Sequence, residues 1–599
     1  MEGRGTNSKT LADLLPRAAE MYGSRPAIRY KESEAWVDRS FSEVAEIVRP
    51  LALGLAEMGV DKGDRVSILG NTRPEWTYFD FAALSIGATV VPIYQTNSPE
   101  ECRYVLENSD AKVVVVEDAE QLAKVRAVRD SLPALRQVVL MAGEAEDAVS
   151  MAEVAARGAA VDQTKWERLY SAVSPADVCT FIYTSGTTGP PKGCIISHAN
   201  YRSMLDMVTE KSVIEPGDVN YLYLPLAHSF ALLIQLSSFD LGTTLAYWER
   251  DPLKILPNLA ELKPTYFPSV PRIFEKIYTA ATSGMEKAGG LKKAVFDWSL
   301  EVGAKMREVE RGGRTPGPLL RAKYSFADKK VLAKIRNLFG GRIRLAISGA
   351  APINPEILRF FDAAGVLVLE GWGMTETSTA ATISTPEDFK VGAIGKPFPG
   401  CEVKIADDGE ILVKGPNVFQ GYHKNEEATR ETIVNGWLHT GDIGEVDSQG
   451  FIKITGRKKD IIITAGGKNI TPANLEAEIK QHPLVSQCVV VGDRRPYLVA
   501  LVTLDPEEAV AYAKEHGLPE DPAALAGDAE VKAAIDAHVE KINENFARVE
   551  QVKKIAILPA DLTQESGELT PTLKVKRAVV TQKHEDVIDE LYGADRAAA

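Results

Sequence analysis

A run of glycines, hydroxyls and one lysine gives this chain a segment suited to holding phosphates. It follows the apolar stretch Val178–Tyr183 and has the sequence Tyr183-Thr-Ser-Gly-Thr-Thr-Gly-Pro-Pro-Lys192. Glycines let a backbone bend closely around an anion, hydroxyls donate hydrogen bonds to phosphate oxygens, and a lysine adds positive charge. The segment therefore predicts a loop that binds a triphosphate. A flexible polar linker is the alternative that composition alone leaves open.

The familiar phosphate loop of P-loop NTPases does not fit this segment. That loop requires the pattern G-x-x-x-x-G-K-[ST]. Counted from Gly186, the second glycine would fall at Pro191, and Gly193 follows Lys192 where a serine or threonine is needed. Since proline has no N–H to offer a phosphate, the mismatch is chemical as well as formal.

A second motif has groups suited to a nucleotide base and a metal ion. Gly371–Thr377 has the sequence Gly-Trp-Gly-Met-Thr-Glu-Thr and follows an apolar run. The flat indole of Trp372 can stack on a base, while the Thr375 hydroxyl and the Glu376 carboxylate can meet a phosphate and its magnesium. A tryptophan between glycines is also typical of a hydrophobic core, so both interpretations stay open.

An aspartate and an arginine are candidates for the sugar of the same nucleotide. Asp442 ends the run Trp-Leu-His-Thr-Gly-Asp, and Arg457 comes fifteen positions later. An ionised carboxylate only accepts hydrogen bonds, which suits a ribose diol with two hydroxyl donors. A turn-capping aspartate and an arginine that caps a domain boundary are the structural alternatives.

Length and composition indicate a soluble protein of several domains. The chain has 599 residues, of which 45% are hydrophobic and 25% charged, with a net charge of −14. At roughly 150 residues per domain, several domains are expected, and the acidic balance argues against nucleic acid as the main partner. The N-terminus lacks an apolar signal core, and no run approaches the ~20 apolar residues that cross a bilayer. Five scattered cysteines fit a reducing cytoplasm and support neither disulfides nor a zinc site.

One segment departs from this acidic balance. Between Arg311 and Arg344 the chain has ten Lys or Arg and one acidic residue, Asp328, which gives a local net charge of +9. A solvated helical face is the plain interpretation. The alternatives are a surface that meets an anionic membrane, or one that meets the phosphates of a large cofactor.

The apolar pattern predicts α/β architecture for most of the chain. A helix is expected at 74–87 and another from Pro355, with Asn354 as its N-cap and Gly365 at its end. Short apolar runs predict strands, and the run at 112–117 is typical of a buried parallel strand. These strands are expected at 65–70, 88–94, 112–117, 343–348 and 366–370. Alternating strands and helices of this kind indicate a parallel sheet.

The character of the chain changes twice after residue 390. Short strands punctuated by Gly and Pro predict a small β-barrel-like subdomain over 392–422. A new α+β unit then begins near Lys459, with a helix capped by Thr471 and two acidic amphipathic helices between 506 and 549. In this unit strands are expected at 461–464, 488–491 and 497–504. We therefore predict an N-terminal domain over 1–457, with two α/β subdomains and the β-rich one, and a smaller C-terminal domain over 458–599.

The order of the motifs resembles that of the adenylate-forming acyl-CoA synthetase superfamily. The matching motifs are YTSGTTGPPKG, LPLAH (Leu224–His228), SGAAPI (Ser348–Ile353), GWGMTET, HTGD, GRKKD and, near the end, LTPTLKVKR (Leu569–Arg577). Seven ordered motifs span roughly Leu11 to Val580, which makes a chance match improbable. The resemblance implies ATP, Mg²⁺ and coenzyme A as the cofactors. It also implies a mobile C-terminal lid on a hinge at Lys459.

The resemblance assigns roles position by position. The β- and γ-phosphates of ATP would lie against Thr184, Ser185, Gly186, Thr187, Thr188, Gly189 and Lys192. The adenine would lie against Gly349, Ala350, Ala351, Gly371, Trp372, Gly373, Met374 and Thr375. Glu376 and Thr184 would hold the metal, and Asp442 and Arg457 the ribose.

Two further residues are implied near the reacting carboxylate. Lys574 matches the lid lysine that reaches the carboxylate and the α-phosphate, although Leu573 precedes it where the family usually has glycine. Lys576 lies two residues on and would share its side in an extended segment. His228 lies where the family places a residue beside the acid, and a hydrogen-bonded structural histidine is the alternative. A carboxylate needs no general base at neutral pH.

The implied substrate is a long-chain fatty acid that is activated as an acyl-adenylate and then transferred to coenzyme A. Val270–Phe274 and a basic helical insertion over 294–339 are similar to the long-chain branch. The alternatives are a fatty acyl-AMP ligase that serves a carrier protein, a ligase for another acid, and a non-catalytic nucleotide or lipid sensor. The sequence sets no oligomeric state. A cytoplasmic protein with a peripheral contact at the inner face of the membrane is the expected location.

Overall fold

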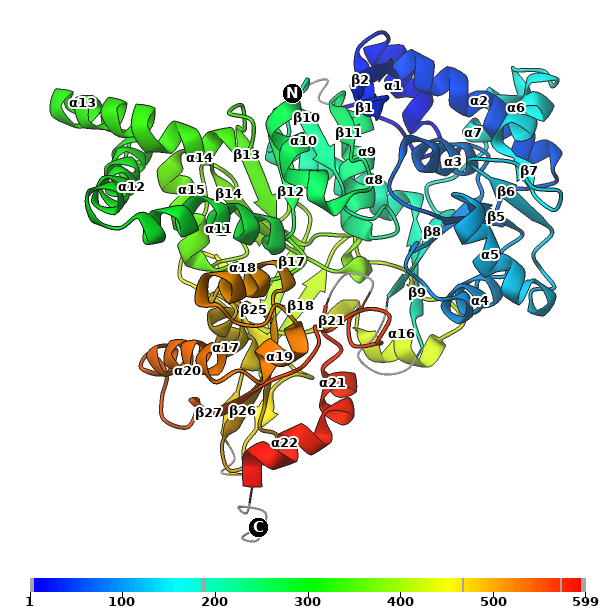
Figure 1. Ribbon diagram of the computed structural model, residues 1–599. Helices are drawn as coiled ribbons and strands as arrows, with labels where there is room; N and C mark the ends of the chain where they lie inside the picture. The colour runs from blue at the N-terminus through cyan, green and yellow to red at the C-terminus, as the bar shows by residue number, and fades with distance from the viewer. Residues whose placement is uncertain (1–4, 185–189, 466–467, 571–573, 594–599) are drawn as a thin grey trace.

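The computed structural model describes residues 5–184, 190–465, 468–570 and 574–593. Figure 1 shows a large body built from the blue, green and yellow parts of the chain, with a smaller orange and red unit beneath it. The architecture is α/β, as the sequence predicts. Mixed sheets are flanked by helices in the large body, and the smaller unit has a short sheet of its own.

The first sheet of the large body has nine strands and a mostly parallel centre. Its order is β16 (Lys396–Pro397), β15 (Thr382–Ile383), β14 (Val368–Trp372), β13 (Leu345–Ser348), β12 (Tyr266–Ser269), β10 (Val219–Leu222), β11 (Thr244–Tyr247), β1 (Pro26–Glu32) and β2 (Ala35–Ser40). The parallel pairing brings the carboxyl ends of β12, β13 and β14 to one edge. Ligands bind beyond this edge in open α/β sheets.

The second sheet has eight strands and carries the predicted phosphate loop. Its order is β19 (Gly421–Tyr422), β9 (Lys192–Ser197), β8 (Val178–Thr184), β4 (Thr89–Ile93), β3 (Arg65–Leu69), β5 (Val113–Val116), β6 (Gln137–Leu140) and β7 (Val149–Ser150). All four valines of β5 are buried, and both neighbours of β5 run parallel to it. The apolar run at 112–117 is thus confirmed as a strand inside a parallel sheet.

Three smaller sheets complete the chain. The β-rich subdomain extends beyond the predicted range 392–422, because strands far along the chain join its sheet. That sheet has β17 (Glu402–Ile405), β18 (Glu410–Lys414), β20 (Ile433–Val434), β21 (Trp437–Val446) and β22 (Ile452–Arg457), whereas β16 and β19 belong to the two larger sheets. The C-terminal unit has β23 (Ile462–Ile463) paired with β24 (Asn469–Ile470), and a sheet of β25 (Val485–Val491), β26 (Leu498–Leu504) and β27 (Val552–Ile557). Two hydrophobic clusters of this unit draw all their buried residues from beyond the hinge segment.

The helices of the large body cover the faces of its sheets. They are α1 (Leu14–Tyr22), α2 (Phe41–Glu57), α3 (Pro74–Ser85), α4 (Pro99–Asn108), α5 (Ala119–Val128), α6 (Met151–Ala159), α7 (Lys165–Ser171), α8 (His198–Lys211), α9 (Ser229–Leu241), α10 (Ile255–Leu262), α11 (Pro271–Ala288), α12 (Gly290–Arg311), α13 (Pro318–Ala327), α14 (Ala333–Asn337), α15 (Pro355–Ala364) and α16 (Glu426–Thr432). The basic insertion is confirmed as helical, and α12 and α13 form an arm that projects at one edge of Figure 1.

Helix ends test the capping predictions directly. The Asn354 side chain accepts a hydrogen bond from the Glu356 amide, and Gly365 ends α15 with a φ of 86°. Thr471 stands before α17 (Pro472–Ile479), but its side chain makes no capping bond, so that part of the prediction is wrong.

The two helices expected between 506 and 549 are three: α18 (Pro506–His516), α19 (Pro522–Ala526) and α20 (Ala529–Asn543). The Asp521 cap begins α19 as a separate short helix. The chain then ends in α21 (Arg577–Lys583) and α22 (Glu585–Tyr592).

A buried histidine ties the N-terminal segment to the large body. The His198 ring is fully buried, and its Nδ1 accepts a hydrogen bond from the Leu11 amide at 3.1 Å. Burial, the largest cause, lowers the pKa of His198 to about 4, so the ring is neutral in the folded protein at neutral pH. The neutral ring is what allows Nδ1 to accept that hydrogen bond.

This contact predicts a pH-dependent stability. Because the unfolded chain binds a proton at His198 below pH ~6.5 and the folded protein only below about pH 4, this contribution is lost as pH falls between those values. The slope is roughly 1.4 kcal/mol per pH unit within that window. We therefore expect the stability of the wild type, measured by thermal unfolding, to decrease relative to that of His198→Gln as the pH is lowered from 7 to 4.5. A stability difference between the two proteins that does not change with pH would contradict a neutral, buried His198.

Candidate active site

The predicted base-binding segments lie side by side at one sheet edge. Gly349–Ala351 follows β13, and the Gly349 amide donates to the Ser269 carbonyl oxygen at 3.1 Å. Gly371 and Trp372 end the neighbouring strand β14. At Gly373 an added Cβ would lie 2.3 Å from the Thr379 carbonyl oxygen, so only glycine fits there. Met374 and Thr375 follow, and Thr375 is buried. The structure therefore brings these segments together at the edge where α/β sheets bind ligands.

The predicted ribose residues form a bonded group with the predicted adenine residue. Asp442 and Arg457 face each other across β21 and β22, and Arg457 Nε donates to Asp442 Oδ1 at 2.7 Å. Trp372 Nε1 donates to Asp442 Oδ2 at 2.9 Å. Trp372 is only 8% exposed and belongs to the main hydrophobic core. Stacking of Trp372 on adenine stays a prediction, while its indole N–H orients the aspartate.

The lid lysine reaches this group from the C-terminal unit. Lys574 interacts electrostatically with Arg457, Asp442 and Glu376, which lie on three segments of the large body. The Lys574 residue as a whole is exposed, whereas its ammonium group is surrounded by other protein groups. Burial is the largest cause that lowers the pKa of Lys574; Arg457 adds to that effect, and the two carboxylates oppose it. Lys574 therefore lies within electrostatic range of three residues of the predicted site.

His228 lies within the field of the same lysine. Burial lowers the pKa of His228 to about 3, and the Lys574 cation contributes to the shift. His228 Nδ1 accepts a hydrogen bond from the Phe230 amide at 3.2 Å and so caps α9. A neutral imidazole that accepts at Nδ1 carries its proton on Nε2. The ring is thus a helix cap and also a fixed N–H donor.

The ends of the phosphate loop are held by a strand pair. Thr184 ends β8 and Lys192 begins β9, and the two residues are paired across the hairpin. Ser185, Gly186, Thr187, Thr188 and Gly189 lie outside the described residues. The strand pairing fixes Thr184 and Lys192 at the two ends of the predicted loop, and its binding of a triphosphate stays a prediction.

Comparison with known proteins decides the family. Residues 15–423 match the model of the AMP-binding enzyme family, and residues 459–596 match that of the AMP-binding enzyme C-terminal domain. The chain belongs to the AMP-binding enzymes. The resemblance found in the sequence motifs is thereby confirmed.

Named relatives extend over nearly the whole chain of this AMP-binding enzyme. The long-chain-fatty-acid–CoA ligase FadD15 of Mycobacterium bovis is 42% identical over 94% of this chain and 93% of its own. The long-chain-fatty-acid–CoA ligase ACSBG2 of Xenopus laevis is 34% identical over 97% of this chain and 84% of its own. Among solved structures, the adenylation domain of a Mycobacterium chelonae carboxylate reductase shares the fold, with a TM-score of 0.77 at 22% identity over 98% of this chain and 92% of its own.

The motifs of this AMP-binding enzyme gave no indication of one residue beside the predicted metal ligand. Tyr422 donates its hydroxyl to Glu376 Oε1 at 2.7 Å, and both side chains are buried. The Lys192 ammonium lies 5.0 Å from the centre of the Tyr422 ring. Strand β19 brings this about, because Tyr422 pairs with Cys194, two residues from Lys192. Tyr422 therefore connects the phosphate-loop lysine to the predicted metal ligand.

The predicted hinge lies directly beyond the ribose group. Arg457 ends β22, and the Lys458 ammonium binds Asp408 at 2.6 Å and Glu410 at 3.2 Å. Lys459 is exposed at the next position. The ion pairs of Lys458 fix the last residue before Lys459 to the β-rich subdomain, so a rotation that begins at Lys459 leaves Arg457 in place. The hinge itself stays a prediction.

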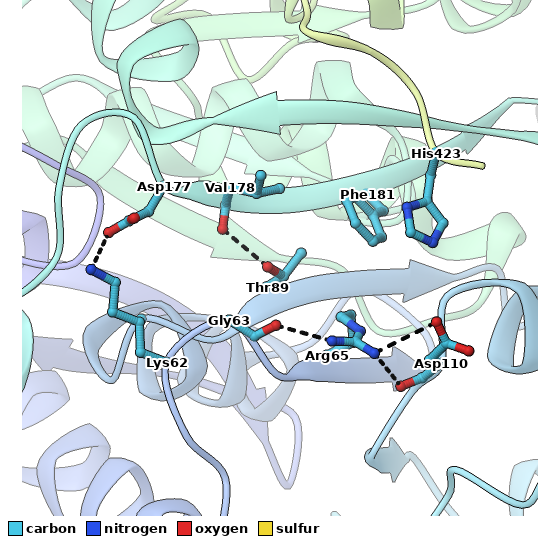
Figure 2. A pocket seen from close by; sticks show the side chains of 10 residues that line it. Lys62, Gly63, Arg65, Thr89, Asp110, Asp177, Val178, Phe181 and His423 are labelled. Atoms are coloured by element: carbon cyan, nitrogen blue, oxygen red, sulfur yellow. Dashed lines mark hydrogen bonds and ion pairs between the residues drawn. The ribbon is translucent and has the colours of Figure 1, made fainter. Parts of the chain in front are cut away.

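A cavity of about 280 Å³ lies elsewhere, at the opposite ends of the parallel strands (Figure 2). Arg65, Thr89 and Val178 begin β3, β4 and β8, and they line the cavity. Its cations already have partners: Lys62 binds Asp177 at 2.6 Å, and Arg65 donates to the Asp110 carbonyl oxygen at 3.1 Å. Because the residues that line this cavity are at the opposite strand ends and include none of the predicted site residues, the cavity is not part of the candidate active site.

Asp442 is expected to stabilise the site as well as to bind ligand. Asp442→Ala leaves the Trp372 N–H without its acceptor and Arg457 without its partner, and a lost buried hydrogen-bond partner costs roughly 1–3 kcal/mol. Asp442→Asn keeps an acceptor and should cost less. Chemical unfolding of both variants measures this, with the exposed Glu402→Ala as control. Equal stability of Asp442→Ala and the control would contradict the bonded group.

Proposed function

We propose that this AMP-binding enzyme is a long-chain-fatty-acid–CoA ligase. It joins the fatty acid to ATP as an acyl-adenylate with release of pyrophosphate, and then transfers the acyl group to coenzyme A with release of AMP. The observation that carries the proposal is the 42% identity with a ligase of that name over 94% of the chain. The first step is supported by the electrostatic contact of Lys574 with Arg457, Asp442 and Glu376. That step brings two anions together, so it needs charged groups from several segments at one place.

The donor set fits magnesium bound together with nucleotide phosphates. Within the described residues, His, Cys, Asp and Glu form no group of three or more that could hold a metal ion. Mg²⁺ is usually held by one or two carboxylates plus substrate phosphates, rather than by a cage made of protein alone. Glu376, oriented by Tyr422, would supply the carboxylate, and Thr184 a hydroxyl. When bound, the ion would offset negative charge on the phosphates.

The residues of the chain would hold the two anions together during attack. Lys192 would bind the outer phosphates, and Asp442 the ribose. The His228 Nε2–H would donate to the carboxylate of the acid, which needs no general base because it is already ionised at neutral pH. Lys574 would lie between this carboxylate and the α-phosphate. There a cation lowers the barrier more than it would in bulk water, because the effective dielectric constant beside protein groups is lower.

Lys574 is expected to serve the first step and not the second. Lys574→Ala should lower fatty-acid-dependent pyrophosphate exchange by hundreds-fold, in line with about 3–4 kcal/mol for one such charge. Thioester formation from supplied acyl-adenylate and coenzyme A should stay within a few-fold of wild type. Lys576→Ala is the matched control and should affect neither step. An equal loss of both steps in Lys574→Ala would reject the assigned role.

One assay distinguishes this function from two alternatives, a fatty acyl-AMP ligase and a non-catalytic sensor. The purified protein is given ATP, Mg²⁺ and acids of increasing chain length, with and without coenzyme A. We expect steady AMP release only with long acids and coenzyme A. Accumulation of acyl-adenylate that coenzyme A does not consume would favour a fatty acyl-AMP ligase, and absence of turnover with any acid would favour a non-catalytic sensor.

A peripheral contact with an anionic membrane would supply this insoluble substrate. On α13 Leu319 (69% exposed) and Phe326 (52% exposed) share a face with Lys323, although the Phe326 ring makes an edge contact with Trp298 of α12. Leu320 and Tyr324 pack toward α12. Lys329 and Lys330 follow, also exposed. None of the helices in the described part of the chain has the length and apolar composition of a membrane span. A face that combines apolar and basic side chains is typical of helices that lie on a bilayer surface.

Vesicle binding tests this contact. At ~0.1 M salt the wild type should sediment with vesicles that contain phosphatidylglycerol and not with pure phosphatidylcholine. Lys323→Gln combined with Lys330→Gln should weaken binding at least tenfold, since each basic residue contributes about 1 kcal/mol near an anionic surface. The double change Leu319→Ser and Phe326→Ser should act similarly, whereas Leu253→Ser, an exposed leucine elsewhere, should not. Failure of the wild type to bind would remove the contact from the proposal.

A further inference from the structure

Arg272 belongs to a sequence motif that the proposed reaction leaves without a role. This motif, Val270–Phe274, directly follows β12. Arg272 is its third residue and lies in the first turn of α11. That position is at the sheet edge where the candidate active site lies. Arg272 is 40% exposed, so its side chain is not part of the core.

Arg272 forms an ion pair with the C-terminal unit. Its Nη2 donates to Asp505 Oδ2 at 2.7 Å. One helical turn later, the Lys276 ammonium lies 3.9 Å from the Glu507 carboxylate. Two cations on one face of α11 thus meet two carboxylates at the start of α18. Figure 1 shows α18 directly beneath α11, where the two units adjoin.

Asp505 is held in a fixed orientation by its own helix. Its Oδ1 accepts hydrogen bonds from the Glu507 and Glu508 amides and caps α18, while Oδ2 is left for Arg272. Its backbone amide donates to the Leu484 carbonyl oxygen. Because the carboxylate is positioned before the pair forms, little side-chain freedom remains to be lost on its side.

We propose that these two ion pairs are a latch that holds the C-terminal unit in the orientation for adenylation, with Arg272 as the positioning residue. The orientation that joins α11 to α18 is the one in which Lys574 interacts with Glu376, Asp442 and Arg457. Arg272 thus acts on Lys574 through the C-terminal unit. The inference rests on the proposed two-step function, in which the lid must leave after the first step.

The strength of the latch suits a reversible lid. Partly exposed ion pairs shift an equilibrium by roughly 1.5- to 5-fold. A pair of this size favours the adenylation orientation without trapping it. Salt should weaken it, since exposed charges are screened over about 10 Å at 0.1 M ionic strength.

A double-mutant cycle on the full-length protein tests the latch. The variants are Arg272→Gln, Asp505→Asn and the two combined; asparagine keeps the cap of α18, because it is itself a good N-cap residue. Each single change should lower fatty-acid-dependent pyrophosphate exchange about 2- to 5-fold at ~0.05 M salt, and the double change should lower it no further. Thioester formation from supplied acyl-adenylate should not fall. The loss should shrink at ~0.5 M salt.

Control variants distinguish loss of the latch from a non-specific loss of folding or activity. Arg103→Gln removes an arginine of similar exposure whose partners lie on its own helix, and it should leave both steps unchanged. If Arg272→Gln does not fold, Lys276→Gln and Glu507→Gln repeat the cycle on the second pair. Unchanged exchange, additive losses in the double variant, or equal loss of both steps would each overturn the latch. Absence of exchange in the wild type would instead refute the proposed function.

Discussion

The central constraint on this protein is the repulsion between two anions that must react. A carboxylate has to approach the α-phosphate of ATP, and two like charges about 4 Å apart repel by roughly 4 kcal/mol near a protein surface. In the proposed reaction, cations from separate segments would meet this constraint: Lys192 at the start of β9, Arg457 at the end of β22 and Lys574 in the C-terminal unit. Each would be costly to bury alone, and carboxylates lie within range of Arg457 and Lys574 to limit that cost.

The large body supplies bonded, oriented groups to the candidate active site, and the C-terminal unit supplies Lys574. Glu376 and Asp442 are buried and bonded to Tyr422, Trp372 and Arg457, so the large body presents oriented acceptors. Lys574 comes from a unit with its own core. In the proposed function, that division would allow Lys574 to arrive for the first step and leave for the second. Partly exposed ion pairs between α11 and α18 are weak enough to permit the exchange.

The sequence predicted local features well and long-range pairings poorly. The buried strand β5 and the Asn354 cap follow from runs of a few residues, and both are confirmed. The bonds from Tyr422 to Glu376 and from Arg272 to Asp505 join residues 46 and 233 positions apart. No periodicity signals such contacts, because they depend on how sheets and domains pack. Thr471 shows the converse: the residue type suits a cap, but its side chain does not make the bond.

Transfer of oxygen from the acid to the nucleotide tests the central claim most directly. A long-chain acid labelled with ¹⁸O in its carboxyl group is turned over with ATP, Mg²⁺ and coenzyme A, and the products are analysed by mass spectrometry. Attack of the carboxylate on the α-phosphorus predicts one labelled oxygen in each AMP formed and none in pyrophosphate. Label in inorganic phosphate, or AMP without label, would contradict the account.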